Sequence, residues 1–282
     1  QASLGLGSIA LAGMMQPDGW GASLPPQARG TVFPLHNPQR AKQVIFLCMA
    51  GGPSQFETFD DKPKLAEMHG QRMPESYTAG MPLAQLQGSE LRCFRPQAKF
   101  AQHGNSGQFI SDLLPSIAGI ADDICIVRSM QTEQINHDPA HTFMNTGTSI
   151  SGRPSMGAWV NYGLGTENEN LPGLVVMVSR GGTPSPQPVS SRQWHSGFLP
   201  GRFQGVPFHS KGDPVHYVTN PPGVSPQRQL HVIETVNALN RMRDAEANNP
   251  EIAARIAQYE LAYRMQTSVP ELVDISSEPQ HV

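Results

Sequence analysis

The sequence has few charged residues, few cysteines and no long apolar segment, and each shortage excludes a class of protein. Charged residues make up 15% of the 282 residues, the net charge is −3 and no basic cluster occurs, so we expect no nucleic-acid partner. The three cysteines form no Cys-x-x-Cys pair, which excludes a cysteine-based zinc site. Apolar runs stay well short of the roughly 18 residues that a membrane-spanning helix needs, so we expect no integral membrane span.

Glycine (27 residues) and proline (26 residues) are abundant, which is typical of a loop-rich globular protein. Three apolar runs, residues 43–50, 124–127 and 174–178, are typical of strands that are buried on both faces. Cys48 and Cys125 lie in two of these runs and are predicted to be buried. Helical patterns alternate with the runs, so the sequence predicts an α/β fold with a mostly parallel sheet flanked by helices.

Helix signals punctuate the rest of the chain. Short helices are predicted over residues 62–68 and 111–121, the second with Ser111 as its N-cap, and Ser155 is expected to cap another helix. Long helices are predicted over residues 226–240 and from Asn249-Pro250 onward. The segment 194–200 is rich in aromatic side chains and is predicted to pack internally, with a pocket wall as the alternative.

The first residues differ in character from the rest. Residues 1–15 are small and apolar and are predicted to be the remnant of a twin-arginine export signal, with a short N-terminal helix as the alternative. Residues 16–40 are rich in glycine, proline and glutamine and are predicted to be a linker. Both features favour a protein exported to the periplasm or cell envelope of a bacterium.

The most informative stretch places His137, Asp138 and His141 at the start of a predicted helix. The two histidines are four positions apart and would share one face of that helix. Imidazoles beside a carboxylate are ligands for divalent metals and also proton-transfer groups, so these three residues are the candidate catalytic residues. The alternative is that Asp138 caps the helix and the histidines pack or form hydrogen bonds.

Two further groups complete the candidate site. Glu57 and Asp60 follow the first apolar run and are candidate metal ligands together with His137 and His141. Ser54, Arg153 and Ser155 are candidate substrate-binding residues, because an arginine ahead of a helix N-terminus favours an anion. Each also has a structural explanation: Ser54 and Asp60 as turn or cap residues, Ser155 as a cap, and Arg153 as a surface ion pair.

These motifs resemble the bacterial domain-of-unknown-function family 1501, which is grouped with sulfatase-like proteins in the alkaline-phosphatase superfamily. The residues that carry the resemblance are 44–54 (VIFLCMAGGPS), 58–60 (TFD), 136–139 (NHDP), 146–147 (TG), 152–159 (GRPSMGAW), 171–173 (LPG), 197–200 (GFLP) and 259–266 (YELAYRMQ).

The resemblance implies that residues 41–282 are the N-terminal part of a sulfatase-like α/β domain that is incomplete at its C-terminus. It also implies hydrolysis of sulfate or phosphate esters at one or two divalent metal ions, zinc, calcium or another. In that alignment His137 stands where a sulfatase has its nucleophile and His141 replaces an arginine, which is a departure from ordinary sulfatase chemistry.

Two functions are therefore expected from the sequence. The first is an exported, metal-dependent hydrolase acting on a small-molecule or glycan ester. The second is a non-catalytic binding or scaffold protein on a sulfatase-like fold, since a fold does not determine a function.

Overall fold

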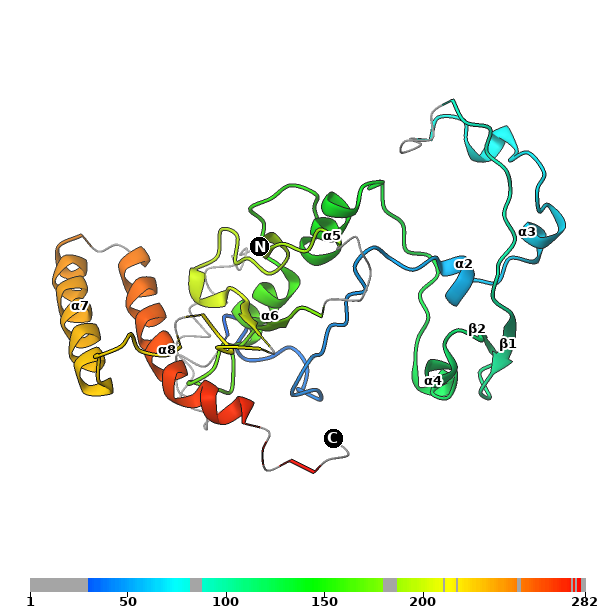
Figure 1. Cartoon of the computed structure of the whole chain (residues 1–282). Helices are drawn as coiled ribbons and strands as arrows, with labels where there is room; N and C mark the ends of the chain where they lie inside the picture. The colour runs from blue at the N-terminus through cyan, green and yellow to red at the C-terminus, as the bar shows by residue number, and fades with distance from the viewer. Residues whose placement is uncertain are drawn as a thin grey trace, which may run out of the picture. The chain divides into compact units, whose positions relative to one another are not determined.

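The computed structural model describes residues 30–81, 88–179, 187–209, 211–216, 218–247, 250–274, 276 and 278–279. Its contacts divide the chain into two compact units, drawn in Figure 1. Unit 1 comprises residues 1–44, 142–186 and 190–282, and unit 2 comprises residues 45–141 and 187–189. The predicted export remnant, and the predicted linker up to residue 29, lie outside the described residues.

Unit 2 is built from short elements around one hairpin. Strands β1 (Phe100–His103) and β2 (Gln108–Ser111) pair antiparallel, with Phe100 opposite Ser111 and His103 opposite Gln108. The remaining elements are α2 (Gln55–Thr58), α3 (Pro63–Glu67), η1 (Glu75–Tyr77), α4 (Pro115–Ala118) and η2 (Ala121–Asp123).

One carboxylate closes the β1–β2 turn. Asp122 accepts hydrogen bonds from the backbone N–H groups of Asn105 (2.9 Å) and Ser106 (2.8 Å). These bonds favour the charged carboxylate and therefore lower the pKa of Asp122 below its usual range. The side chain thus satisfies turn donors that the two short strands leave unpaired.

Unit 1 holds the longer helices and a second small sheet. Its elements are α6 (Met156–Leu164), β3 (Val175–Met177), η3 (Ser191–Gln193), η4 (Gly201–Phe203), β4 (Val206–Phe208), α7 (Pro226–Ala247) and α8 (Pro250–Val273). Strands β3 and β4 pair parallel, with Val175 opposite Val206. Helices α7 and α8 lie side by side (Figure 1).

A small apolar core forms where α8 meets the loops of unit 1. Val218, Met265 and Val269 are buried there, and partly buried side chains such as Leu261 and Phe208 pack against them. No described helix is both long enough and apolar enough to traverse a lipid bilayer.

Local helix signals were predicted well. Ser155 caps α6 by accepting a hydrogen bond from the Ala158 N–H, and Gly165 ends that helix at φ +80°. Proline occupies the first positions of α3 and α4, where its missing N–H costs nothing. Ser111 is not an N-cap as predicted: it ends β2, and α4 begins only at Pro115, since proline fixes the start of that short helix.

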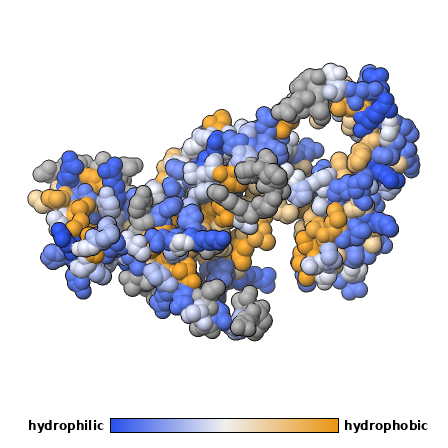
Figure 2. Space-filling model, in the orientation of Figure 1, coloured by the Kyte–Doolittle hydropathy of each residue, from blue (hydrophilic) through white to orange (hydrophobic). Residues whose placement is uncertain are grey.

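The predicted buried strands are the main correction. Residues 43–50 and 124–127 lie outside any strand, and side chains such as Ile45 (84% exposed) and Val127 (58% exposed) face solvent. Cys48 and Cys125 are exposed rather than buried. A strand needs a hydrogen-bonding neighbour, and the described residues supply none to either run, so their apolar side chains remain uncovered. Figure 2 shows hydrophobic surface over the part of unit 2 that holds α4 and β2.

The fold is therefore mixed helix and strand, as expected, but its sheets are small. Among the described residues the strands form one antiparallel and one parallel pair. The run 174–178 forms β3 as predicted, although Val175 and Met177 are exposed rather than buried.

Replacing Asp122 tests the role of the carboxylate that closes the hairpin turn. We expect Asp122→Asn to lower the free energy of unfolding near neutral pH, because the amide loses the charge that strengthens both bonds. Because the pKa of Asp122 is lowered in the folded state, its carboxylate stabilises the fold at pH values above the ordinary pKa of about 3.9. This contribution is lost as the pH falls through the native pKa. Urea unfolding at pH 7 and pH 3 measures the difference.

The matched control for this test is Asp123→Asn, at the exposed neighbouring position. Its carboxylate makes no hydrogen bond within the described parts of the chain, so we expect little change at either pH. An equal loss of stability for Asp122→Asn at both pH values would contradict the role assigned to the charge.

Candidate functional site

The predicted histidine helix exists and begins where the sequence placed it. Helix α5 spans His137–Thr146, with Asp138 in its first turn. The backbone carbonyl of Asn136 accepts the Ala140 N–H at 3.0 Å, and Gly147 follows the last turn at φ +76°. A polar residue before the helix and a glycine after it explain both boundaries.

The two histidines share one face of α5, as predicted from their spacing. Their ring centroids are 6.2 Å apart. They differ in burial, because His137 is exposed to solvent whereas His141 is only 7% exposed. One imidazole is therefore accessible to a ligand and the other is part of the packed interior of unit 2.

His141 joins α5 to the turn that follows the first apolar run. The Gly51 N–H donates to its Nε2 at 2.9 Å, and its Nδ1 lies 3.4 Å from the Pro188 carbonyl oxygen. Since Nε2 accepts a hydrogen bond, the neutral ring carries its proton on Nδ1 and donates toward Pro188. Gly51 (φ +91°) and Gly52 (φ +60°) both have positive φ, which glycine adopts without strain.

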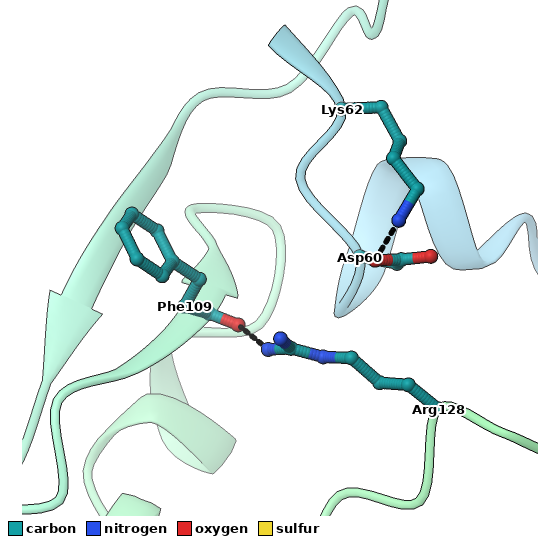
Figure 3. Close-up of polar contacts among 4 residues, drawn as sticks. All are labelled: Asp60, Lys62, Phe109 and Arg128. Atoms are coloured by element: carbon teal, nitrogen blue, oxygen red, sulfur yellow. Dashed lines mark hydrogen bonds and ion pairs between the residues drawn. The ribbon is translucent and has the colours of Figure 1, made fainter.

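The carboxylates predicted as metal ligands have partners within unit 2. Both oxygens of Glu57 accept the Gln97 N–H, at 2.9 and 3.1 Å, and one also accepts the Ala98 N–H at 3.0 Å. Asp60 pairs with Lys62 at 2.6 Å, as Figure 3 shows.

Two other polar residues of unit 2, Arg128 and Ser54, complete the description of its polar contacts. In the same view Arg128 reaches the Phe109 carbonyl oxygen at 3.5 Å. Ser54 stands at the N-cap position of α2, but its hydroxyl forms no capping hydrogen bond.

These contacts decide how well the predicted ligands fit a metal ion. His141, Glu57 and Asp60 each hold protein groups with the atoms that would bind the metal. Within the part of the chain that the structure describes, no three histidine, cysteine, aspartate or glutamate side chains gather into a possible metal site. In this conformation the predicted ligands do not fit a three-ligand site, and metal binding stays a prediction.

Two of the predicted substrate-binding residues, Arg153 and Ser155, lie in unit 1. Ser155 is 3% exposed, its hydroxyl accepts the Ala158 N–H at 3.2 Å, and its own N–H donates to the His195 carbonyl oxygen at 3.0 Å. Its role as a cap is therefore confirmed. The Arg153 guanidinium lies 5.9 Å from the centre of the Phe198 ring. Convergence of these residues with the histidines of unit 2 stays a prediction.

Sequence reasoning missed an aromatic row in unit 1. Trp159 and Tyr162 of α6 contact each other and also contact Phe198 and Phe203, all edge to face. The segment 194–200 had been expected to pack internally, yet Phe198 is 60% exposed. The available signal was the three-residue spacing of Trp159 and Tyr162, which puts both rings on one face of the helix.

Comparison with known proteins identifies the family. Residues 41–282 match the family described as "Protein of unknown function (DUF1501)", and the chain belongs to it. Neither the curated proteins nor the solved structures gave a match to the chain.

A pair of variants on α5 tests which of the two histidines stabilises the fold. We expect His141→Ala to lower the free energy of unfolding by about 2 kcal/mol, because the buried ring loses two partly buried hydrogen bonds. His137→Ala is the matched control on the same helix face, and its exposed ring predicts a change within about 0.5 kcal/mol. Chemical denaturation measures both, and equal effects would contradict the assignment.

Proposed function

We propose that this protein is an exported, sulfatase-like hydrolase of sulfate or phosphate esters in the bacterial cell envelope. The hydrogen bond between Gly51 and His141 is the observation that carries the proposal. It joins the glycine turn to the histidine helix, two segments that belong to the resemblance to family 1501, although His137 departs from the sulfatase pattern. The fold in this proposal is the α/β fold of the alkaline-phosphatase superfamily, with a mostly parallel sheet.

His137 is the reactive group in this proposal. It is exposed and is the first residue of α5, where the helix dipole favours an anionic group of the substrate. A protonated imidazole there can donate its proton to the leaving alcohol oxygen while the ester S–O or P–O bond breaks. Water supplies the new S–O or P–O bond and returns its proton to the ring.

The other candidate residues take supporting roles. His141 positions the helix through its bond to Gly51, and Asp138 lies beside His137 in the first turn of α5. The Ser54 hydroxyl, in the same unit as His137, is proposed to contact the anionic group of the substrate. The Ser155 hydroxyl is occupied as the N-cap of α6. The predicted metal ligands His141, Glu57 and Asp60 hold protein groups, so the proton transfer is assigned to His137 alone.

A second candidate is a non-catalytic binding or scaffold protein on the same fold. The partners of Glu57, Asp60 and His141 favour it, since these side chains stabilise backbone and neighbouring charges instead of facing a common centre. The two candidates differ in whether the protein turns over an ester, which a direct assay can measure.

Turnover of an aryl sulfate and an aryl phosphate by the purified exported protein tests the proposal. We expect hydrolysis of at least one ester, and a loss of about 100-fold in kcat/KM for His137→Ala, because general acid catalysis typically contributes that much. Elemental analysis of the same samples tests the predicted metal: a bound divalent ion near one per chain, reduced in His137→Ala, would confirm it.

The control for that assay is His231→Ala, at an exposed histidine of α7 that is 87% accessible and far along the chain from α5. Its rate should equal that of the wild type. A well-folded wild type that hydrolyses neither ester would overturn the hydrolase and leave the binding protein as the better account.

A further inference from the structure

Six side chains of unit 1 form a continuous series of ring contacts, which we call the aromatic row. Its four rings are Phe198, Trp159, Tyr162 and Phe203, with centroid separations of 5.7, 5.9 and 5.3 Å between successive members. An arginine lies against each terminal ring: Arg153 lies 5.9 Å from the centre of Phe198, and Arg202 lies 4.7 Å from that of Phe203.

Backbone contacts hold the segment that carries Phe198 against the start of α6. Gly197 has φ +59°, and a Cβ built there would lie 2.4 Å from the Pro154 backbone nitrogen, so only glycine allows the two segments to approach. The Ser155 N–H reaches the His195 carbonyl oxygen at 3.0 Å, and the Gly197 N–H reaches the His195 Nδ1 at 2.9 Å. Backbone contacts thus place Phe198 beside α6 independently of the rings themselves.

Much of the row is open to solvent. Phe198 is 60% exposed and Trp159 is 45% exposed, whereas Phe203 is buried at 8% and anchors the row. Large exposed rings are costly unless something covers them, so a surface of this kind is typical of a binding site.

The row also carries uncompensated positive charge. Within the described residues, neither Arg153 nor Arg202 forms an ion pair or a side-chain hydrogen bond, and each guanidinium lies over an aromatic ring. Their guanidinium N–H groups can therefore donate to an anionic ligand, for which the planar fork of arginine is well suited. The net charge of the chain is −3, so this positive surface is a local feature.

The chemistry of the row favours a sugar. The face of an aromatic ring is negative, and the C–H groups on the face of a pyranose carry slight positive charge, so the two surfaces attract. The arginines at the two ends would pair with carboxylate or sulfate groups on the same chain of sugars. Rings and cations in one row therefore fit an oligosaccharide that bears acidic groups.

Other partners fit the row less well. A nucleic acid would be expected to bind a larger basic area than two arginines on a chain of net charge −3. A protein partner would be expected to insert anchoring side chains into pockets, whereas Trp159 and Phe198 project into solvent.

One end of the row opens into a pocket. Arg202 lines a cavity of about 370 Å³ together with Gln204, Gln258, Val206 and Met265. Amide groups among apolar side chains are groups that sugar hydroxyls can bind. A sugar chain on the rings would therefore have polar contacts at its Arg202 end.

We propose that the aromatic row binds an anionic oligosaccharide, with one sugar ring on the face of Trp159 and the acidic groups on Arg153 and Arg202. The inference does not depend on catalysis, because a hydrolase and a binding protein would both use such a surface. For the hydrolase, it gives the class of substrate: acidic glycans.

The proposal is tested by measuring the binding of a sulfated chondroitin tetrasaccharide to the whole 282-residue chain. Calorimetry and tryptophan fluorescence both report this binding. We expect saturable binding that weakens as salt increases, since the arginine contacts are exposed. Arg153→Gln and Trp159→Ala should each weaken binding by about 10-fold, the loss expected for one charge-assisted contact or one stacked ring. Thermal unfolding of each variant verifies its fold.

Matched controls separate the row from general effects of charge and aromatic content. Arg228→Gln removes an exposed arginine of α7 and Tyr259→Ala removes a ring of α8 that is 47% exposed, and neither should change the affinity. A neutral cellotetraose should bind more weakly than the sulfated probe.

Several results would overturn the proposal. These are no binding by the wild type, equal losses in the control variants, binding of sodium sulfate alone with the same affinity, or tighter binding of an acidic peptide. Because the assay measures binding only, its failure would leave the esterase assay unaffected, and a protein without esterase activity can still bind the sugar.

Discussion

A buried imidazole holds together the segments of unit 2 that carry its sequence motifs. The ring of His141 takes the Gly51 N–H on one nitrogen and faces the Pro188 carbonyl with the other, so α5, the glycine turn and the segment 187–189 meet on one side chain. Both contacts need the neutral ring in one tautomer. This constraint places His137, one helical turn earlier, at the surface with a defined orientation.

The sequence correctly predicted the features that depend on residues close together in the chain, such as helix ends and the faces of helices. Ser155 and Gly165 fix the ends of α6 through bonds within a few residues, and the spacing of His137 and His141 correctly placed both on one face. The apolar runs 43–50 and 124–127 failed as strands because a strand is stabilised by a partner that local sequence does not specify. The aromatic row was missed for the same reason: α6 and the segment 198–203 meet only in the folded chain.

In the candidate site, a motif predicts which residue types are present, but the contacts in the structure determine whether those side chains are available to a ligand. Residue types at Glu57, Asp60 and His141 suit a metal ion, yet each holds a group of the protein itself. His137 keeps an accessible ring, and so do Trp159 and Phe198 in unit 1. Membership of a family of unknown function adds no residue roles, so accessibility is the property that separates candidate functional groups from structural ones.

The uncovered apolar run after Val44 has a consequence for handling this protein. Ile45, Leu47 and Met49 are 84%, 85% and 69% exposed, and no charged residue interrupts the segment 44–50. An extended, uncharged segment with free backbone edges is a template for intermolecular β-pairing. At high concentration, self-association through this segment competes with measurement of any ligand, and placing a lysine at position 47 would act as a gatekeeper against it.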